Sequence, residues 1–197
     1  MDDKSNIIYG MHLGEMNHVM NNLMECIKRG SLEIKEKTGM NPVEHLKFRI
    51  KSDESMREKC RRMGLPETEE SALSYLYDAI GLRVVCSFLD DVYSIRDFIA
   101  SQDDIEIIRE KDYIRNVKPN GYRSYHMIIR AEGYYAEIQI RTISMDTWAA
   151  LEHHIRYKKN IGGNVTLIFE ELKRCADELA STDASMQTLR CMINEEW

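Results

Sequence analysis

The sequence predicts an α/β (α+β) fold, in which a mixed sheet of about five strands is flanked by helices. Two features predict it. Stretches with the short apolar or alternating pattern of strands interleave with longer stretches of helical periodicity. The 197 residues also contain no internal repeat and no long linker, so we expect one domain, 1–197, with one sizeable core.

The first elements follow from side-chain spacing. Residues 7–29 place apolar side chains at helical intervals, so we expect an amphipathic helix whose methionines belong to the core or to a subunit contact. Residues 44–51 alternate cationic and apolar side chains, which predicts a strand with one basic face. Ser52 is then expected to cap a helix that runs to about Arg62 and ends before Gly64.

The later elements are expected by the same criteria. Glu132-Gly133 is a turn signal between two strand-like stretches, and Gly162-Gly163 is expected to end a helix. Two further helices should fill the C-terminus. The expected segments are a strand at 79–88, a helix at 89–101, a strand at 104–114, a hairpin of 122–131 and 134–142, and a helix at 144–159.

The composition favours a cytosolic protein without membrane contact. The N-terminal segment MDDKSN is acidic and polar, unlike a signal peptide, and the apolar stretch AIGLRVVCSF is interrupted by Arg83. The five cysteines are odd in number and form no C-x-x-C pair. We therefore expect reduced thiols rather than disulfides or a zinc site.

Charge is unevenly distributed along the chain. Residues 47–62 hold seven Lys/Arg against three Asp/Glu, and residues 109–130 hold six against two. Each window therefore carries +4, while the rest of this −6 chain carries −14. This pattern favours a focused anion site over an extended nucleic-acid surface. The alternative is that both windows are solvated faces without a ligand.

The first basic window has the pattern of a phosphate site. Arg49 and Lys51 share one face of the expected strand, which leads into a helix N-terminus with its free amides. Ser55, Lys59 and Arg62 follow at i, i+4 and i+7, so they share one helix face. Together these groups predict a polyphosphate site, against the alternative of a solvated helix. No P-loop motif is present.

Two carboxylates occupy positions suited to a divalent metal. Asp78 stands directly before a buried strand, and Glu137 lies inside another, on the same face as Gln139 and Arg141. Mg²⁺ takes one or two carboxylates together with phosphate oxygens. The alternative is that both are surface carboxylates or ion-pair partners of Arg83 or Arg141.

The stretch KPNGYRSYH, residues 118–126, gathers aromatic and polar groups behind a turn. Asn120-Gly121 signals the turn, and Tyr122 and His126 then share one strand face. An exposed tyrosine ring can stack on a base, and amide or imidazole groups can bond its edge. The alternative for His126 is a satisfied core histidine.

Five blocks in order resemble the synthetase domain of the RelA/SpoT family, which makes the alarmones (p)ppGpp. They are FRIKSDESMREK, DAIGLRVVCSF, REKDYIRNVKPNGYRSYH, EIQIRT and WAALEH, and they span roughly residues 45–160. The resemblance implies a nucleotidyltransferase-like sheet, with an N-terminal helical region at 1–44, a catalytic core at 45–160 and C-terminal helices at 161–197. No His-Asp metal dyad is present, so the chain resembles a small alarmone synthetase.

The resemblance implies transfer of the β,γ-pyrophosphoryl group of ATP to the 3′-hydroxyl of GDP or GTP. Asp78 and Glu137 would bind Mg²⁺, and Glu137 would also activate the hydroxyl. The residues implied for ATP are Arg49, Lys51, Ser55, Lys59, Arg62 and Arg83. Those implied for the acceptor nucleotide are Tyr122, Asn120, His126, Lys118, Lys111, Arg109 and Gln139.

Other readings stay open at this point. A relative within the family could transfer pyrophosphate to the tRNA 3′ end, and a nucleotide-binding module could be inactive. Val117 and Tyr125 stand where the family pattern has proline and leucine, so the choice between GDP and GTP is open. By similarity, a homotetramer and an allosteric (p)ppGpp ligand are further expectations.

Overall fold

The computed structural model describes residues 7–157 and 164–195. The elements are η2 (Gly10–His12), α1 (Leu13–Thr38), β1 (Val43–Ile50), α2 (Asp53–Met63), η3 (Ser71–Tyr75), β2 (Ile80–Cys86), α3 (Leu89–Ala100), β3 (Ile105–Asp112), β4 (Tyr125–Ala131), β5 (Tyr134–Thr142), α4 (Ile143–Tyr157) and α5 (Val165–Glu195).

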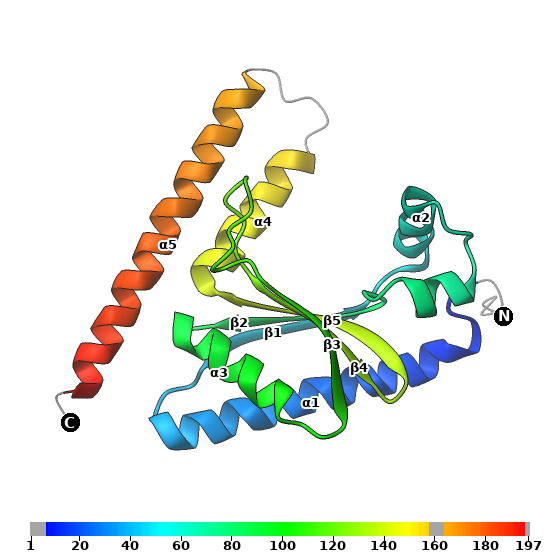
Figure 1. Cartoon of the computed structure of the whole chain (residues 1–197), viewed down its shortest axis with the longest axis horizontal. Coiled ribbons are helices and arrows are strands. Elements are labelled where there is room, and N and C mark those ends of the chain that lie inside the picture. The colour runs from blue at the N-terminus through cyan, green and yellow to red at the C-terminus, as the bar shows by residue number, and fades with distance from the viewer. Residues whose placement is uncertain (1–6, 158–163, 196–197) are drawn as a thin grey trace.

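The five strands form one mixed sheet in the order β1-β2-β5-β4-β3 (Figure 1). β2 and β5 are parallel, and the other neighbours are antiparallel. In the parallel pair Gly81 lies opposite Glu137, and Arg83 opposite Gln139. The mixed sheet flanked by helices confirms the expected fold class. Its register brings side chains from separate parts of the sequence onto one face.

α1 and α3 cover one face of the sheet and form the core with it (Figure 1). Met16 and Met20 of α1 are buried there, so these methionines belong to the core. The two helices approach closely at Gly30, where an added Cβ would lie 2.3 Å from the Phe98 ring. A side chain at this position would therefore push α3 away.

The opposite face of the sheet lies between α2 and α4 (Figure 1). α5 packs along α4 and touches α3. A buried ion pair fixes its far end, because Arg190 Nη1 lies 2.6 Å from Asp91 Oδ1 at the start of α3. In the described part of the chain no helix is long and apolar enough to span a membrane.

Several expected elements differ from the structure, and three of the differences are large. The first helix does not end at residue 29, because Gly30 packs within it; α1 runs on to Thr38 and ends at Gly39, whose φ is +75°. The prediction of two C-terminal helices is wrong: α5 is a single helix, and the segment 165–195 holds no glycine or proline to interrupt it. β4 begins at Tyr125, three residues later than expected. Gly162-Gly163 lies outside the described residues.

Candidate active site

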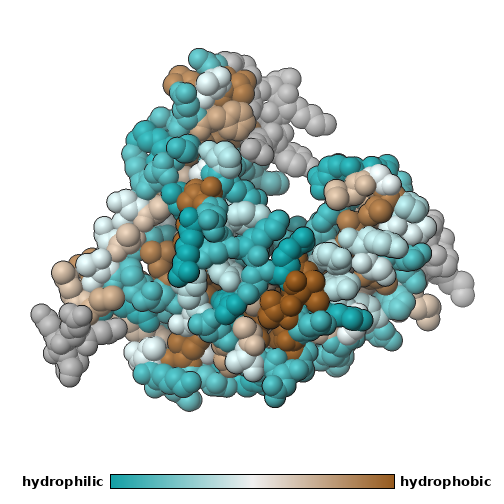
Figure 2. Space-filling model, viewed as in Figure 1, coloured by the Kyte–Doolittle hydropathy of each residue, from teal (hydrophilic) through white to brown (hydrophobic). Residues whose placement is uncertain are grey.

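A cavity of about 210 Å³ opens on the face of the sheet between α2 and α4. Figure 2 shows a hollow on this side of the molecule, with hydrophilic residues along it. The structure places five of the residues expected around ATP or metal in its lining. These are Arg49, Lys51, Asp78, Arg83 and Glu137; Lys47, Phe48, Gly81, Leu82 and Gln139 complete it. We call this space the donor cavity.

Asp78 is held between two ammonium groups at the end of the donor cavity. Its Oδ2 lies 2.6 Å from Lys51 Nζ, and its Oδ1 lies 2.7 Å from Lys59 Nζ. Burial opposes the charge on Asp78, but the two lysines hold the pKa of this carboxyl below its ordinary value. Asp78 is therefore ionised at neutral pH, and its partners are these lysines rather than Arg83 or Arg141.

The N-terminus of α2 follows directly from the basic strand. Ser52 caps it as expected, with its Oγ accepting from the Ser55 amide at 3.3 Å. Lys59 reaches Asp78 from the next turn of the helix. The structure does not bring Ser55, Lys59 or Arg62 into the lining of the donor cavity. Lys59 contacts it through Asp78, whereas Ser55 and Arg62 are exposed, so the assignment of these residues to ATP stays a prediction.

A second cavity of about 200 Å³ lies on the other side of Glu137. We call it the acceptor cavity. Its lining includes four of the residues expected around the acceptor nucleotide, and it also includes Glu137. The full lining is Arg109, Lys111, Tyr113, Lys118, His126, Ile128 and Glu137. Lys118 Nζ lies over two aromatic rings, 4.2 Å from the centroid of Tyr113 and 4.7 Å from that of Tyr122.

Glu137 lines both cavities, and both of its oxygens have partners. Oε1 lies 3.2 Å from His126 Nδ1, and Oε2 accepts from Gln139 Nε2 at 3.1 Å. Burial raises the pKa of Glu137, but the hydrogen bonds to His126 and Gln139 lower it by more, so the net shift of the pKa is downward. An ionised carboxylate is thus fixed at the boundary of the two spaces.

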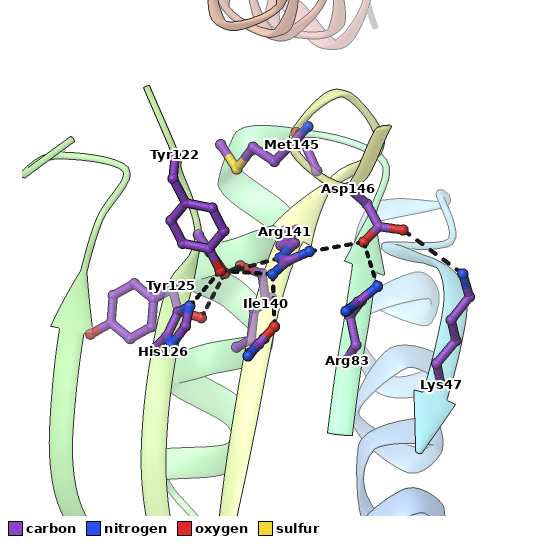
Figure 3. Close-up of polar contacts among 12 residues, drawn as sticks. Lys47, Arg83, Tyr122, Tyr125, His126, Ile140, Arg141, Met145 and Asp146 are labelled. Atoms are coloured by element: carbon purple, nitrogen blue, oxygen red, sulfur yellow. Dashed lines mark hydrogen bonds and ion pairs between the residues drawn. The ribbon is translucent and has the colours of Figure 1, made fainter. Parts of the chain in front are cut away.

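Tyr122 is bonded through its hydroxyl, which the sequence did not predict. The hydroxyl accepts from Arg141 Nη2 at 2.7 Å and lies 2.8 Å from His126 Nε2 (Figure 3). Asn120 does not line the acceptor cavity; its Oδ1 accepts from the Tyr122 amide at 3.2 Å and so shapes the turn. Gly121 has φ +89°, and an added Cβ would lie 2.7 Å from Ala176 of α5.

Sequence reasoning missed two charged residues that organise this face. The alternation along β5 placed Arg141 on the face of Glu137 and Gln139, but the only role expected for it was that of an ion-pair partner, and Asp146 was not considered. No sequence pattern of this kind includes Asp146. It lies near the site only because α4 begins directly after β5 ends.

Comparisons with known proteins agree with the geometry. The region found in RelA / SpoT proteins matches residues 48–162. GTP pyrophosphokinase YwaC of Bacillus subtilis (strain 168) is 43% identical over 156 residues, which are 75% of this chain and 74% of YwaC. The crystal structure of small alarmone synthetase 2 from B. subtilis gives a TM-score of 0.78 at 37% identity, covering 90% of this chain and 96% of that one.

A second solved structure carries a ligand. Small alarmone synthetase 1 from B. subtilis, bound to its product pppGpp, gives a TM-score of 0.77 at 28% identity and covers 90% of this chain and 94% of that one. The fold and site define a nucleotide-binding sheet with two basic cavities around one carboxylate. This chain belongs to the RelA/SpoT family, and the resemblance seen in its sequence motifs is confirmed.

Proposed function

We propose that this protein is a GTP pyrophosphokinase of the small alarmone synthetase type. It transfers the β,γ-pyrophosphoryl group of ATP to the 3′-hydroxyl of GDP or GTP, which yields (p)ppGpp and AMP. One observation carries the proposal: the ionised Glu137 lies on the boundary between two basic cavities. A base at such a boundary can take a proton from an acceptor in one cavity while a phosphoryl donor occupies the other.

The donor cavity suits a triphosphate because cations reach it from three elements. Arg49 lies on β1 and Lys51 directly after it, Arg83 lies on β2, and Lys59 of α2 contacts the cavity residue Asp78. Charge on the transferred group and on the leaving AMP is stabilised by such fixed cations. Since Lys51 and Lys59 are already paired with Asp78, nucleotide binding would exchange these ion pairs for phosphate contacts.

The acceptor cavity suits a purine nucleotide. The ring of Tyr122 stands beside His126 and below the Lys118 ammonium, and it is only partly buried. Arg109 and Lys111 of β3 add positive charge along the same cavity. We infer that the base stacks on Tyr122, that the 5′-phosphates meet these cations, and that the 3′-hydroxyl points to Glu137.

Asp78 and Glu137 fit a magnesium ion that arrives with the nucleotide. Both are ionised and line the donor cavity. Among the described residues no group of three or more His, Cys, Asp or Glu is arranged to hold a metal without further ligands. Two carboxylates completed by phosphate oxygens are the mode of binding that Mg²⁺ uses with nucleotides. When bound, the ion would neutralise charge on the phosphates.

A transfer assay tests the proposal. The purified protein is incubated with ATP labelled at the γ-phosphate, with Mg²⁺, and with GDP, GTP or tRNA in separate reactions. We expect label in GDP or GTP and release of AMP rather than ADP, with no product when the metal is chelated. Label in tRNA alone would identify the tRNA-modifying relative, and no transfer to any acceptor would identify an inactive nucleotide-binding module.

We also propose a homo-oligomer, with a tetramer as the expected form. The last turns of α5 expose four large apolar side chains, Met186, Leu189, Met192 and Ile193, each more than half exposed. Such a row on a helix is typical of a subunit contact. Light scattering that gives the mass of a monomer at micromolar concentration would contradict it.

A further inference from the structure

Arg141 is a buried cation with a partner for each nitrogen of its guanidinium. The residue is only 4% exposed. Its Nη2 donates to the Tyr122 hydroxyl and to Gln139 Oε1, both at 2.7 Å. Its Nη1 donates to Asp146 Oδ1 at 3.1 Å, and its Nε to Ser124 Oγ at 3.4 Å. Figure 3 shows Arg141 between Tyr122 on one side and Asp146 on the other.

Two paths of successive hydrogen bonds connect Arg141 with the two carboxylate oxygens of Glu137. One path runs from Arg141 through the Tyr122 hydroxyl and the two nitrogens of His126 to Oε1. The other runs from Arg141 through the Gln139 amide to Oε2. A single guanidinium therefore fixes the carboxylate from two directions, although it does not touch Glu137 itself.

The first path has a direction, because a guanidinium can only donate. The Tyr122 oxygen accepts from Arg141, so its own proton points to His126 Nε2. A neutral His126 that accepts at Nε2 carries its proton on Nδ1, where it donates to Glu137. The path thus presents Oε1 of Glu137 with a hydrogen-bond donor and fixes its position.

Asp146 links the same guanidinium to the donor cavity. In the first turn of α4, its Oδ1 accepts from Arg141 at 3.1 Å and from Arg83 Nη1 at 3.2 Å, and its Oδ2 lies 3.9 Å from Lys47 Nζ (Figure 3). Burial and the nearby Arg141 lower the pKa of Arg83, and Asp146 opposes this shift. One carboxylate therefore holds cations from β1, β2 and β5 that would otherwise repel one another.

We propose that Arg141, anchored by Asp146, is the positioning residue that orients Glu137 and Tyr122 together and keeps them in register with the donor cations. The proposal rests on the proposed function, since it gives Arg141 a role toward the base of that reaction. A buried ion pair that only braces the fold is the competing explanation.

The test uses Arg141→Met. Arg141→Lys is the variant that keeps the positive charge but lacks the planar guanidinium that donates to several partners at once. In Arg141→Met we expect kcat/KM to fall about 100-fold, the loss typical of a misplacement of about 1 Å. The loss should lie in kcat, because Glu137 is held through the two hydrogen-bonded paths from Arg141, and it is measured at a temperature where the variant is folded. Arg141→Lys should show the same loss of kcat with a melting temperature near that of the wild type.

The matched control is Arg190→Met, which removes another buried arginine paired with an aspartate, Asp91, away from both cavities. It should lower the melting temperature and leave the kcat of the folded protein unchanged. An equal fall of kcat in Arg190→Met would overturn the proposal, because the effect would then come from lost stability. An unchanged kcat in either folded Arg141 variant would also overturn it.

A spectroscopic measurement separates this proposal from the proposed function. Nitrogen-15 NMR of the histidines, with His126 assigned through His126→Gln, reports which ring nitrogen carries the proton. We expect Nδ1–H in the wild type and a mixture of tautomers in Arg141→Met. Nε2–H in the wild type would overturn the proposal whether or not the protein transfers pyrophosphate, whereas absence of transfer alone would overturn only the proposed function.

Discussion

The two cavities on either side of Glu137 balance their positive charge in different ways. Around the donor cavity three cations are paired with carboxylates: Lys51 and Lys59 with Asp78, and Arg83 with Asp146. In the acceptor cavity, as far as the structure describes the chain, no carboxylate lies within ion-pair distance of the cations Arg109, Lys111 and Lys118. Instead Lys118 lies over the rings of Tyr113 and Tyr122, and Arg109 lies 5.9 Å from the ring centroid of Tyr77.

This difference indicates two modes of binding. A ligand in the donor cavity must displace ion pairs, which favours a partner that brings both phosphates and a metal ion. A ligand in the acceptor cavity meets aromatic faces and cations not paired with carboxylates, which favours a flat base with phosphates attached. Substitutions in each half should therefore affect different substrates, and substitutions at the boundary should affect both.

The largest effect is expected at the boundary. Glu137→Gln keeps the shape of the side chain but removes the proton acceptor, so kcat should fall by about 10²–10⁴-fold with the protein still folded. Initial rates and thermal melts check this result. Glu106→Gln, on the exposed surface of β3, is the control and should keep the wild-type rate. Near-normal turnover in Glu137→Gln would remove Glu137 from the chemistry.

The next effect concerns the acceptor half alone. Tyr122→Ala removes the ring proposed to stack on guanine, and base–aromatic stacking contributes about 1–3 kcal/mol. The acceptor KM at saturating ATP should rise about tenfold to a hundredfold. Tyr134→Ala, at the start of β5 against His12 before α1, removes a ring outside both cavities and should leave this KM unchanged. A destabilised Tyr122→Ala with an unchanged acceptor KM would contradict stacking.

Tyr122→Phe separates the ring from the hydroxyl. From the sequence alone this variant should be mild, but the structure changes the expectation. The Tyr122 hydroxyl accepts a hydrogen bond from Arg141 and lies within hydrogen-bond distance of His126 Nε2. A hydrogen bond to a charged group contributes about 1.5–3 kcal/mol. We therefore expect Phe to keep the acceptor KM and to lower kcat about tenfold. A change in KM without a change in kcat would contradict the hydrogen-bonded path to Glu137.

The third effect concerns the donor half. Lys59→Ala removes one cation from Asp78, and we expect the KM for ATP to rise about tenfold while the acceptor KM stays constant, since a hydrogen bond to a charged group contributes about 1.5–3 kcal/mol. Arg61→Ala is the control on the same helix, because Arg61 is exposed and pairs with Glu67. Equal increases in both KM values would indicate that α2 has only a structural role.

The sequence predicted the sheet well because its strands carry strong local patterns. The alternation of β1 and the pattern of β5 placed Arg49 and Glu137 on their strands, and Glu132-Gly133 gave the hairpin, with both residues at positive φ. The ends of α1 and α5 were harder to predict. Gly30 resembles a break but is required by packing against Phe98, and tertiary packing is invisible to a local pattern.

The candidate site was predictable in its residues but not in its pairings. Asp78 and Glu137 were identified, yet the partners of Asp78 are lysines 27 and 19 positions earlier, which only the fold brings together. The role of the Tyr122 hydroxyl depends on Arg141, which lies 19 residues later, on β5. Motifs name residue types, whereas hydrogen bonds across strands depend on register.

The smallest effect tests the charge balance of the donor half without any substrate. The pKa of Asp78 is lowered in the folded state, so this carboxylate stabilises the fold at pH values above about 3.9, its usual unfolded pKa. The contribution is lost as pH falls through the lower, folded pKa. The melting temperature of the wild type should exceed that of Asp78→Asn by a few degrees at pH 7, and the difference should shrink toward pH 3. Carboxylates that do not interact with Asp78 are common to both proteins and cancel in this difference.

Lys111→Met is the matched change in the acceptor half, where no carboxylate pairs with the cation in the described structure, so its difference from the wild type should stay constant over the same range. A difference for Asp78→Asn that does not depend on pH would show that the lysine pairs contribute nothing to the folded state, and the contrast between the two cavities would then rest on binding alone.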